Sequence, residues 1–236
     1  INMSKVDYET KINSKPYRFF DLIYRLLVVN VLTIILSCTV IFLFPSFVAA
    51  TATLKEGNVE MNIFKQYFIN FKKYLKKSFF TGLIMLIFYL VLGYAIYFYA
   101  KAYFTDDEEH TLGMLFLNAG FMVCLVGFLI VLFLNGHMAL IIISFTTLTI
   151  PEIFRTGFYV TFRYLLTTLI LFVLNLLIIV GLICCIIRFQ VLAIWMLFGI
   201  SLPIYLGVKI TAPVYYKFSK IDFEKIMHAG EEESDE

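Results

Sequence analysis

The sequence predicts an all-α polytopic membrane protein with about five transmembrane helices. Of its 236 residues, 61% are hydrophobic, and the mean hydropathy is +0.88. Soluble domains stay nearer to half apolar. Several apolar runs also exceed the roughly 20 residues that a helix needs to cross a bilayer. We therefore expect an integral membrane protein with little room for a separate soluble domain.

Five apolar segments define the expected spans. The third is too long for one straight span and too short for two, because at 1.5 Å per residue it would extend roughly 50 Å. We expect it to form one helix that tilts or protrudes, with a bend most favoured at Asn135-Gly136-His137. Glycines and prolines predict a bent fifth span. The expected spans are residues 20–44, 78–100, 112–148, 164–187 and 191–212.

Lysine and arginine placement predicts the orientation, because cytosolic segments carry an excess of both. The link between the first two spans, the link between the third and fourth, and the C-terminal segment are all basic, so we expect them in the cytosol. The acidic loop at residues 101–111 suits the outside. Five spans then place the N-terminus outside, although residues 1–19 are also basic. A re-entrant first segment broken at Pro45 is the alternative that brings the N-terminus inside.

Two basic, aromatic stretches ninety residues apart predict an internal repeat. Residues 63–75 read IFKQYFINFKKYL, and residues 153–165 read IFRTGFYVTFRYL. A chance match is the alternative in a chain rich in Phe, Ile and Leu, but both copies follow an apolar segment and lead into a span. The aligned pairs include Phe64/Phe154, Lys65/Arg155, Phe68/Phe158 and Lys73/Arg163.

The expected repeat unit is a span, a cytosolic interfacial helix and a second span. Residues 20–100 form the first unit and residues 112–187 the second, both in the same orientation, as in membrane proteins with parallel repeats. A fifth span at residues 188–214 and a cytosolic tail at residues 215–236 complete the expected organisation.

The two interfacial helices are the first set of candidate functional elements. Aromatic residues of the first copy recur at steps of three and four, as on one face of an amphipathic helix. Such a helix either anchors the protein at the lipid surface and shapes the fold, or docks a protein partner. The candidate interface residues are Phe64, Lys65, Phe68, Phe71, Lys72, Lys73, Phe154, Arg155, Phe158 and Arg163.

Polar side chains inside the apolar segments are the second set of candidates, because an unpaired amide is costly in hydrocarbon. For the asparagines we expect interhelical hydrogen bonds, with a polar substrate cavity as the alternative. For the histidine we expect a polar-network or boundary role, with proton or ligand binding as the alternative, since one histidine without a nearby carboxylate makes a weak catalytic site. These residues are Asn30, Asn118, Asn135, His137 and Asn175.

We expect no catalytic residue, cofactor or metal site. The sequence contains no HExxH, GxSxG or GxxxxGK[ST] motif, and its four cysteines lie in apolar runs without a CxxC pair. The expected protein is therefore not an enzyme. Its expected partners are membrane lipids and other membrane proteins, with no nucleic acid, and the sequence names no small-molecule ligand.

Three stretches resemble the YesL-like family of small bacterial membrane proteins, a domain family of unknown function. They read KPYRFFDLIYRLLVVNVLTIIL, FPSFVAATATLKEG and FKQYFINFKKYLKKSFFTGLI, and the resemblance is clearest over residues 16–92. Its marks are Asn30, the proline and small residues at 45–53, and Phe71-Lys72. The family usually has a glycine before the small-residue stretch, where this chain reads SFV.

The resemblance implies a multi-pass protein in the cytoplasmic membrane of a Gram-positive bacterium. The family's genes often lie beside carbohydrate-uptake genes, especially those of sugar-importing ABC transporters. A sugar permease would show a cytosolic EAA-type docking loop, which this chain lacks. The expected function is therefore an accessory, non-catalytic subunit of an oligosaccharide ABC importer that contacts the permease subunits. A stand-alone small transporter or channel, and a membrane-organising scaffold, are the alternatives.

Overall fold

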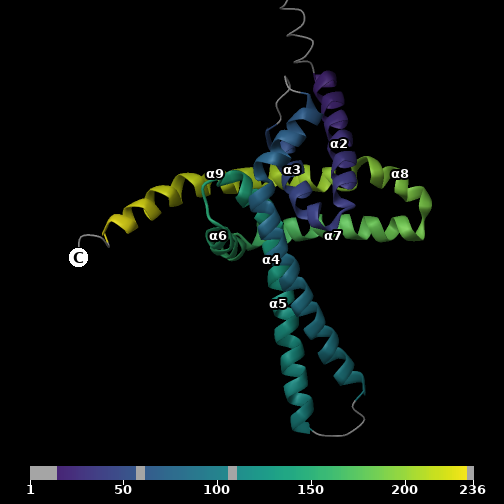
Figure 1. Cartoon of the computed structure of the whole chain (residues 1–236), viewed down its shortest axis with the longest axis vertical. Helices are drawn as coiled ribbons and strands as arrows, with labels where there is room; N and C mark the ends of the chain where they lie inside the picture. Colours follow the sequence, from purple (N-terminus) through teal and green to yellow (C-terminus); the bar gives the residue numbers. More distant parts are fainter. Residues whose placement is uncertain (1–14, 57–61, 106–110, 233–236) are drawn as a thin grey trace, which may run out of the picture.

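The computed structural model describes residues 15–56, 62–105 and 111–232, and all regular structure within these ranges is helical (Figure 1). The predicted all-α class is confirmed. The elements are α2 (Lys15–Ser37), η1 (Val40–Phe42), α3 (Leu43–Glu56), α4 (Ile63–Thr105), α5 (Thr111–Ser144), α6 (Ile150–Arg163), α7 (Leu165–Ile187), α8 (Phe189–Phe198) and α9 (Ser201–Glu232).

Four of these helices are long and apolar enough to cross a membrane, and a fifth span results if α8 and α9 are counted together. That pair is bent by 43° at a short break. The prediction of about five spans with a bent fifth is therefore confirmed. The four single candidates are Pro16–Ser37, Ile63–Ala102, Asn118–Ser144 and Leu165–Ile187.

The first apolar segment, expected as one span at residues 20–44, is divided between α2 and the start of α3. Pro45 lies in the first turn of α3, where its missing N–H costs no helical hydrogen bond. Ala49, Ala50 and Ala52 are fully buried, because their small side chains let α3 pack closely against its neighbours. α2 and α3 form a helical hairpin, so the start of α2 and the end of α3 lie at the same end of the molecule (Figure 1).

The two copies of the basic, aromatic stretch fold differently, which corrects the expected repeat unit. In the first copy the stretch and the following span are one continuous 43-residue helix, α4, rather than two helices. In the second copy α6 and α7 are separate, with the break at Tyr164. α5 is one helix that ends at Ser144, and it continues through Asn135–His137, where a bend was expected.

The last helix extends beyond the expected fifth span. α9 begins at Ser201 and continues to Glu232, so most of the expected tail at residues 215–236 is helical. In Figure 1 this part of α9 runs away from the other helices. The expected N-terminal segment and acidic loop fall largely on residues 1–14 and 106–110, outside the described residues.

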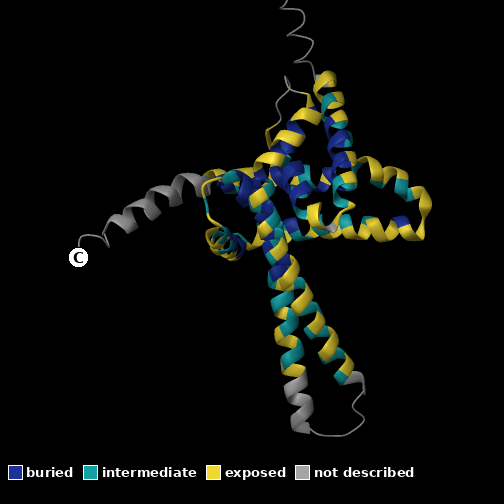
Figure 2. Cartoon of the chain, viewed as in Figure 1, coloured by how far each residue is buried: buried dark blue, intermediate teal, exposed yellow. Residues whose placement is uncertain are grey.

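The buried core lies where α3 meets α2, α4, α5 and α9. α3 contributes to two buried clusters, one shared with α2 and α4 and the other with α4, α5, α6, α7 and α9. Two helical arms leave this core in different directions, namely the far half of the α4–α5 pair and the α7–α8 pair (Figures 1 and 2). Their surfaces are largely exposed and apolar, so they require lipid or a partner protein around them.

Candidate functional site

The ninety-residue repeat extends to the pattern of burial. Positions 63, 67, 70, 78 and 81 of α4 are buried, and so are all five positions ninety residues later. In α4 this spacing of three, four and eight residues places them on one helix face, whereas the second set is divided between α6 and α7. Each copy therefore turns an equivalent face to the core. The buried pairs are Ile63/Ile153, Tyr67/Gly157, Asn70/Val160, Ser78/Thr168 and Thr81/Leu171.

The opposite face of each copy is exposed and combines rings with positive charge. In α4 the rings of Phe64 and Phe68 are 46% and 50% exposed. In α6 Phe158 and Phe162 are 43% and 60% exposed. We call these two surfaces the aromatic–basic faces. The face on α4 consists of Phe64, Lys65, Phe68 and Lys72, and the face on α6 consists of Arg155, Phe158, Phe162 and Arg163.

Three other predicted interface residues contribute to the fold or to local pairs. Phe71 is half-buried and makes an edge-to-face contact with Phe42 across 5.8 Å, which joins α4 to η1. Phe154 is half-buried and packs against the larger core cluster. The ammonium group of Lys73 lies 5.0 Å from the ring centre of its neighbour Tyr74. The predicted set therefore divides into exposed residues of the two aromatic–basic faces and residues that pack in the fold or form local pairs.

The break between α6 and α7 is held by a side chain. At Tyr164 the backbone leaves the helical region, with φ −116° and ψ 53°. The hydroxyl of Thr168 donates to the carbonyl of Thr161 across 2.9 Å, so this carbonyl has a donor at the end of α6. Capping of this kind lets a helix end inside a protein without an unpaired carbonyl.

His137 supports this cap in a buried chain of hydrogen bonds. Its Nε2 lies 2.8 Å from the Thr168 hydroxyl, and its Nδ1 lies 2.9 Å from the Tyr215 hydroxyl. Because Thr168 uses its one proton on a carbonyl, it must accept from Nε2–H, and a neutral His137 must then accept at Nδ1 from Tyr215. The chain Tyr215 to His137 to Thr168 to Thr161 connects α9, α5, α7 and α6. His137 therefore lies in a structural polar network.

Asn30 holds the second break, between α8 and α9. Its amide nitrogen donates to the carbonyls of Trp195 (3.2 Å) and Met196 (2.6 Å) at the end of α8. Its amide oxygen accepts from the backbone N–H groups of Ile200 (2.8 Å) and Ser201 (2.9 Å) at the start of α9. Asn30 is fully buried, so one side chain from α2 satisfies both ends of a broken helix.

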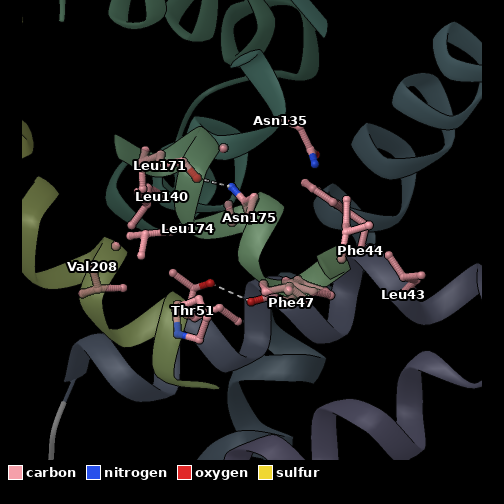
Figure 3. Close-up of a pocket in the computed structure, with 17 residues that line it drawn as sticks. Leu43, Phe44, Phe47, Thr51, Asn135, Leu140, Leu171, Leu174, Asn175 and Val208 are labelled. Carbon is pink, nitrogen blue, oxygen red and sulfur yellow. Dashed lines mark hydrogen bonds between the residues drawn. The ribbon is translucent and has the colours of Figure 1, made fainter. Parts of the chain in front are cut away.

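Asn135 and Asn175 line a cavity of about 190 Å³ between α3, α5, α7 and α9 (Figure 3). The amide nitrogen of Asn175 donates to the carbonyl of Leu171 in its own helix, at 2.9 Å. The amide of Asn135 makes no hydrogen bond within the described part of the chain. Asn118 is exposed at the start of its span, far along α5 from this cavity. Of the predicted polar residues, the structure thus brings Asn135 and Asn175 together at one cavity, while His137 bonds Tyr215 and Thr168.

Two lysines connect the repeats, a role that the sequence analysis missed. Lys77 of α4 donates to the carbonyls of Thr146 and Leu148 (2.9 Å for the latter) in the loop before α6. Lys55 of α3 donates to the hydroxyl of Ser144 at 2.9 Å. Partial burial lowers the pKa of Lys55. No sequence pattern signals these contacts, because the partners are more than sixty residues apart.

The start of α6 has a recognisable sequence signal that was also missed. Thr149-Ile150-Pro151-Glu152 has the spacing of a capping box with proline in the first turn. In the structure the backbone N–H of Thr149 donates to Glu152 at 2.7 Å, and this bond lowers the pKa of the Glu152 carboxyl. The cap fixes where α6 begins, and with it the aromatic–basic face that α6 carries.

The buried polar groups described above serve to cap helix ends. Within residues 15–56, 62–105 and 111–232 there is no group of three His, Cys, Asp or Glu side chains that could hold a metal ion. Asn30, His137 and Thr168 are each bonded to backbone or to one another. The remaining candidate groups are the exposed rings and positive charges of the two aromatic–basic faces and, inside the fold, the amide of Asn135.

Residues 26–96 match the model of a family described as "Protein of unknown function, DUF624". Neither a curated protein nor a solved structure matches the chain. The matched segment contains Asn30, the second half of α2, all of α3 and the aromatic–basic face of α4. The YesL-like resemblance is consistent with this match.

Proposed function

Since residues 26–96 belong to the DUF624 family, whose function is unknown, we propose from the geometry that the protein is a non-catalytic membrane subunit that docks to partner proteins. The YesL-like resemblance supplies the class of partner, namely the permease subunits of a carbohydrate ABC importer. On this proposal the protein is an accessory or regulatory subunit for oligosaccharide uptake in the cytoplasmic membrane of a bacterium.

The two aromatic–basic faces carry the proposal. Four phenylalanine rings, Phe64, Phe68, Phe158 and Phe162, are 43–60% exposed on helices whose opposite faces are firmly buried. Aromatic and basic residues are the side chains that most often dominate binding at protein interfaces. A rigid helix that presents them loses little conformational freedom on binding. Two equivalent copies suit a partner that is itself a pair of related subunits.

The buried polar groups support a non-catalytic role. Asn30 uses both donors and both acceptor positions on the ends of α8 and α9. His137 is bonded at both ring nitrogens, to Tyr215 and Thr168. Groups with all their hydrogen-bonding capacity committed to the fold are poorly placed to act as acids, bases or nucleophiles.

We also propose an orientation. The α2–α3 hairpin brings the start of α2 to the same end as the lysine-rich start of α4, so the basic N-terminal segment and the lysine-rich link would both lie in the cytosol. This favours the re-entrant arrangement over an external N-terminus. Cysteine accessibility at Ser4→Cys in intact cells tests it: protection from a membrane-impermeant maleimide supports the arrangement, and labelling overturns it.

Pull-down of the chromosomally tagged protein in mild detergent, followed by mass spectrometry, tests the function. We expect two permease subunits and an ATPase with the wild type, and about tenfold less of them with Phe64→Ser/Phe68→Ser, because exposed aromatic anchors dominate interface energy. The matched control is Leu90→Ser/Tyr94→Ser, two exposed residues at the same spacing on α4. Recovery of the wild type alone, or equal loss in both double variants, overturns the proposal.

A stand-alone transporter is the second candidate, and the cavity lined by Asn135 and Asn175 is the observation that favours it. Uptake of a radiolabelled oligosaccharide into proteoliposomes that contain only this protein would support it. An uptake rate equal to that of empty liposomes would exclude it for the sugar used. A membrane-organising scaffold would instead be indicated by recovery of the protein solely as a homo-oligomer.

A further inference from the structure

A second, larger cavity of about 350 Å³ adjoins the one shown in Figure 3 and lies between η1, α3, α4 and α5. Leu43, Phe44 and Asn135 line both cavities, so they form a shared wall. In Figure 3 the Asn135 side chain points to the side on which Phe44 lies. The two spaces are therefore neighbouring compartments with one amide between them.

The lining of the larger cavity is almost entirely apolar. Apart from Asn135 and the Tyr89 hydroxyl, its described lining residues are Ile, Leu, Phe, Gly and Met. Tyr89 already reaches the carbonyl of Val131 at 3.5 Å. A sugar requires several convergent hydrogen-bonding groups, whereas this lining offers one unpaired amide. The chemistry fits a long hydrocarbon chain with one hydrogen-bond acceptor.

The mouth of the larger cavity is continuous with the lipid-facing surface. Ile41, Leu83 and Leu86 line it and are 65%, 43% and 40% exposed. Leu83 and Leu86 lie within the candidate span of α4, so their exposed sides face hydrocarbon. An apolar cavity that opens into a bilayer is filled by the surrounding chains, because empty space forfeits dispersion contacts.

We propose that the larger cavity binds one acyl chain of a membrane phospholipid and that the Asn135 amide donates a hydrogen bond to a carbonyl oxygen of that lipid. Three observations combine here: an uncharged apolar lining, a mouth among lipid-facing residues, and an unpaired amide at the wall shared with the cavity of Figure 3. The site is separate from the aromatic–basic faces, so the lipid-binding proposal is tested independently of the proposed docking function.

Photolabelling tests the site directly. The full-length protein is reconstituted in phosphatidylglycerol vesicles that contain a phosphatidylglycerol with a diazirine on one acyl chain, and labelled peptides are mapped by mass spectrometry. We expect labels to concentrate on residues 41–44 and 79–89. Leu43→Trp places an indole at the shared wall and should reduce this labelling about tenfold, since the chain can no longer enter.

The matched control is Leu90→Trp, the same substitution at a more exposed position of α4 that lines neither cavity. It should leave the labelling unchanged. Thermal unfolding of both variants verifies that they fold. Labels spread evenly over the exposed apolar surfaces, or equal labelling in Leu43→Trp and wild type, would overturn the proposal.

Asn135→Leu tests the hydrogen bond. We expect lipid retention, followed by native mass spectrometry during detergent washing, to fall about threefold to tenfold, which corresponds to the loss of one neutral hydrogen bond. The unfolding temperature should be equal or higher, because an unpaired amide is removed from an apolar wall. Unchanged lipid retention would overturn the role of Asn135.

Discussion

The two copies of the repeat turn equivalent faces to the core, yet one is a single helix and the other is broken. α4 continues without interruption through Tyr74, whereas the chain leaves the helical conformation at the equivalent Tyr164. In Figure 1 α6 is seen nearly end-on and α7 runs across the view, whereas α4 is one uninterrupted helix. Similar local sequences therefore do not decide whether the helix continues.

Contacts from outside each copy account for the difference. The Ser78 hydroxyl donates to the Tyr74 carbonyl within its own helix at 2.7 Å, which leaves the helix intact. The equivalent Thr168 hydroxyl also lies within hydrogen-bond distance of the Tyr164 carbonyl (3.1 Å), but in addition it reaches the Thr161 carbonyl across the break (2.9 Å) and His137 (2.8 Å). His137 aligns with Phe47 of the first copy at the ninety-residue step. It thus supplies a hydrogen-bond partner that the first copy lacks.

The aligned positions 67 and 157 show a second difference. Tyr67 fills a buried space and donates to the carbonyl of Ser46 in α3 at 3.1 Å. Gly157 leaves no such space, because a Cβ there would lie 2.8 Å from Leu134 Cδ1. α6 therefore packs closely on α5 at this point, where a side chain larger than that of glycine would require Leu134 to move.

Of the three tests of this difference between the copies, removing His137 should have the largest effect on the free energy of unfolding. His137→Leu leaves the hydroxyls of Thr168 and Tyr215 without their buried partner, so we expect a loss of about 2–4 kcal/mol in the free energy of unfolding. The control is Phe47→Leu at the equivalent position, where we expect a loss below about 1.5 kcal/mol. Reversible unfolding in mixed micelles measures both. A similar cost for the two variants would show that the network has no special role.

Thr168→Val and Ser78→Ala should show a smaller difference in stability between the two copies. The first removes the donor to Thr161 and the acceptor for His137, and we expect a loss of about 0.5–2 kcal/mol. The second removes a hydroxyl whose acceptor is already in a helical hydrogen bond, and we expect a change within about 0.5 kcal/mol. Amide hydrogen exchange should accelerate at residues 165–169 only in Thr168→Val. Faster exchange at 75–79 in Ser78→Ala would contradict this account.

The smallest effect concerns the starts of the two helices. α4 begins with a neutral cap, in which Asn62 accepts from the Phe64 N–H at 3.0 Å, and α6 with the Glu152 carboxylate. Because the pKa of Glu152 is lowered, its contribution is present above the ordinary value of about 4.3 and is lost as the pH falls through the folded-state pKa. The Thr149 amide NMR shift should titrate below about pH 4.5, whereas the Phe64 shift should not.

Glu152→Gln is the control for this titration, since it keeps the acceptor and removes the ionisable group. The Thr149 amide shift should then be independent of pH over the same range. A titration that persists in the variant would assign the pH dependence to another group.

Much of the candidate site could be predicted from local patterns. The step of ninety residues identifies the α4 face and all of the α6 face except Phe162, which aligns with Lys72 rather than with a ring. Hydropathy places Asn30 and His137 inside the membrane-spanning segments. Their partners could not be predicted, because Asn30 bonds residues more than 160 positions away and His137 bonds Tyr215. The missed cap at Thr149–Glu152 could have been predicted, because Thr-x-x-Glu is a known sequence signal for the start of a helix.

The sequence by itself determined the all-α membrane class, the approximate spans and the repeat, because apolar length and helical periodicity are local properties of the chain. Only the tertiary structure decided that the first segment folds into the α2–α3 hairpin, that α4 continues and that α6 ends at Tyr164. Each of these depends on whether a side chain from a distant helix satisfies backbone groups at that point. In a membrane, where water cannot replace a missing partner, such contacts decide where helices break.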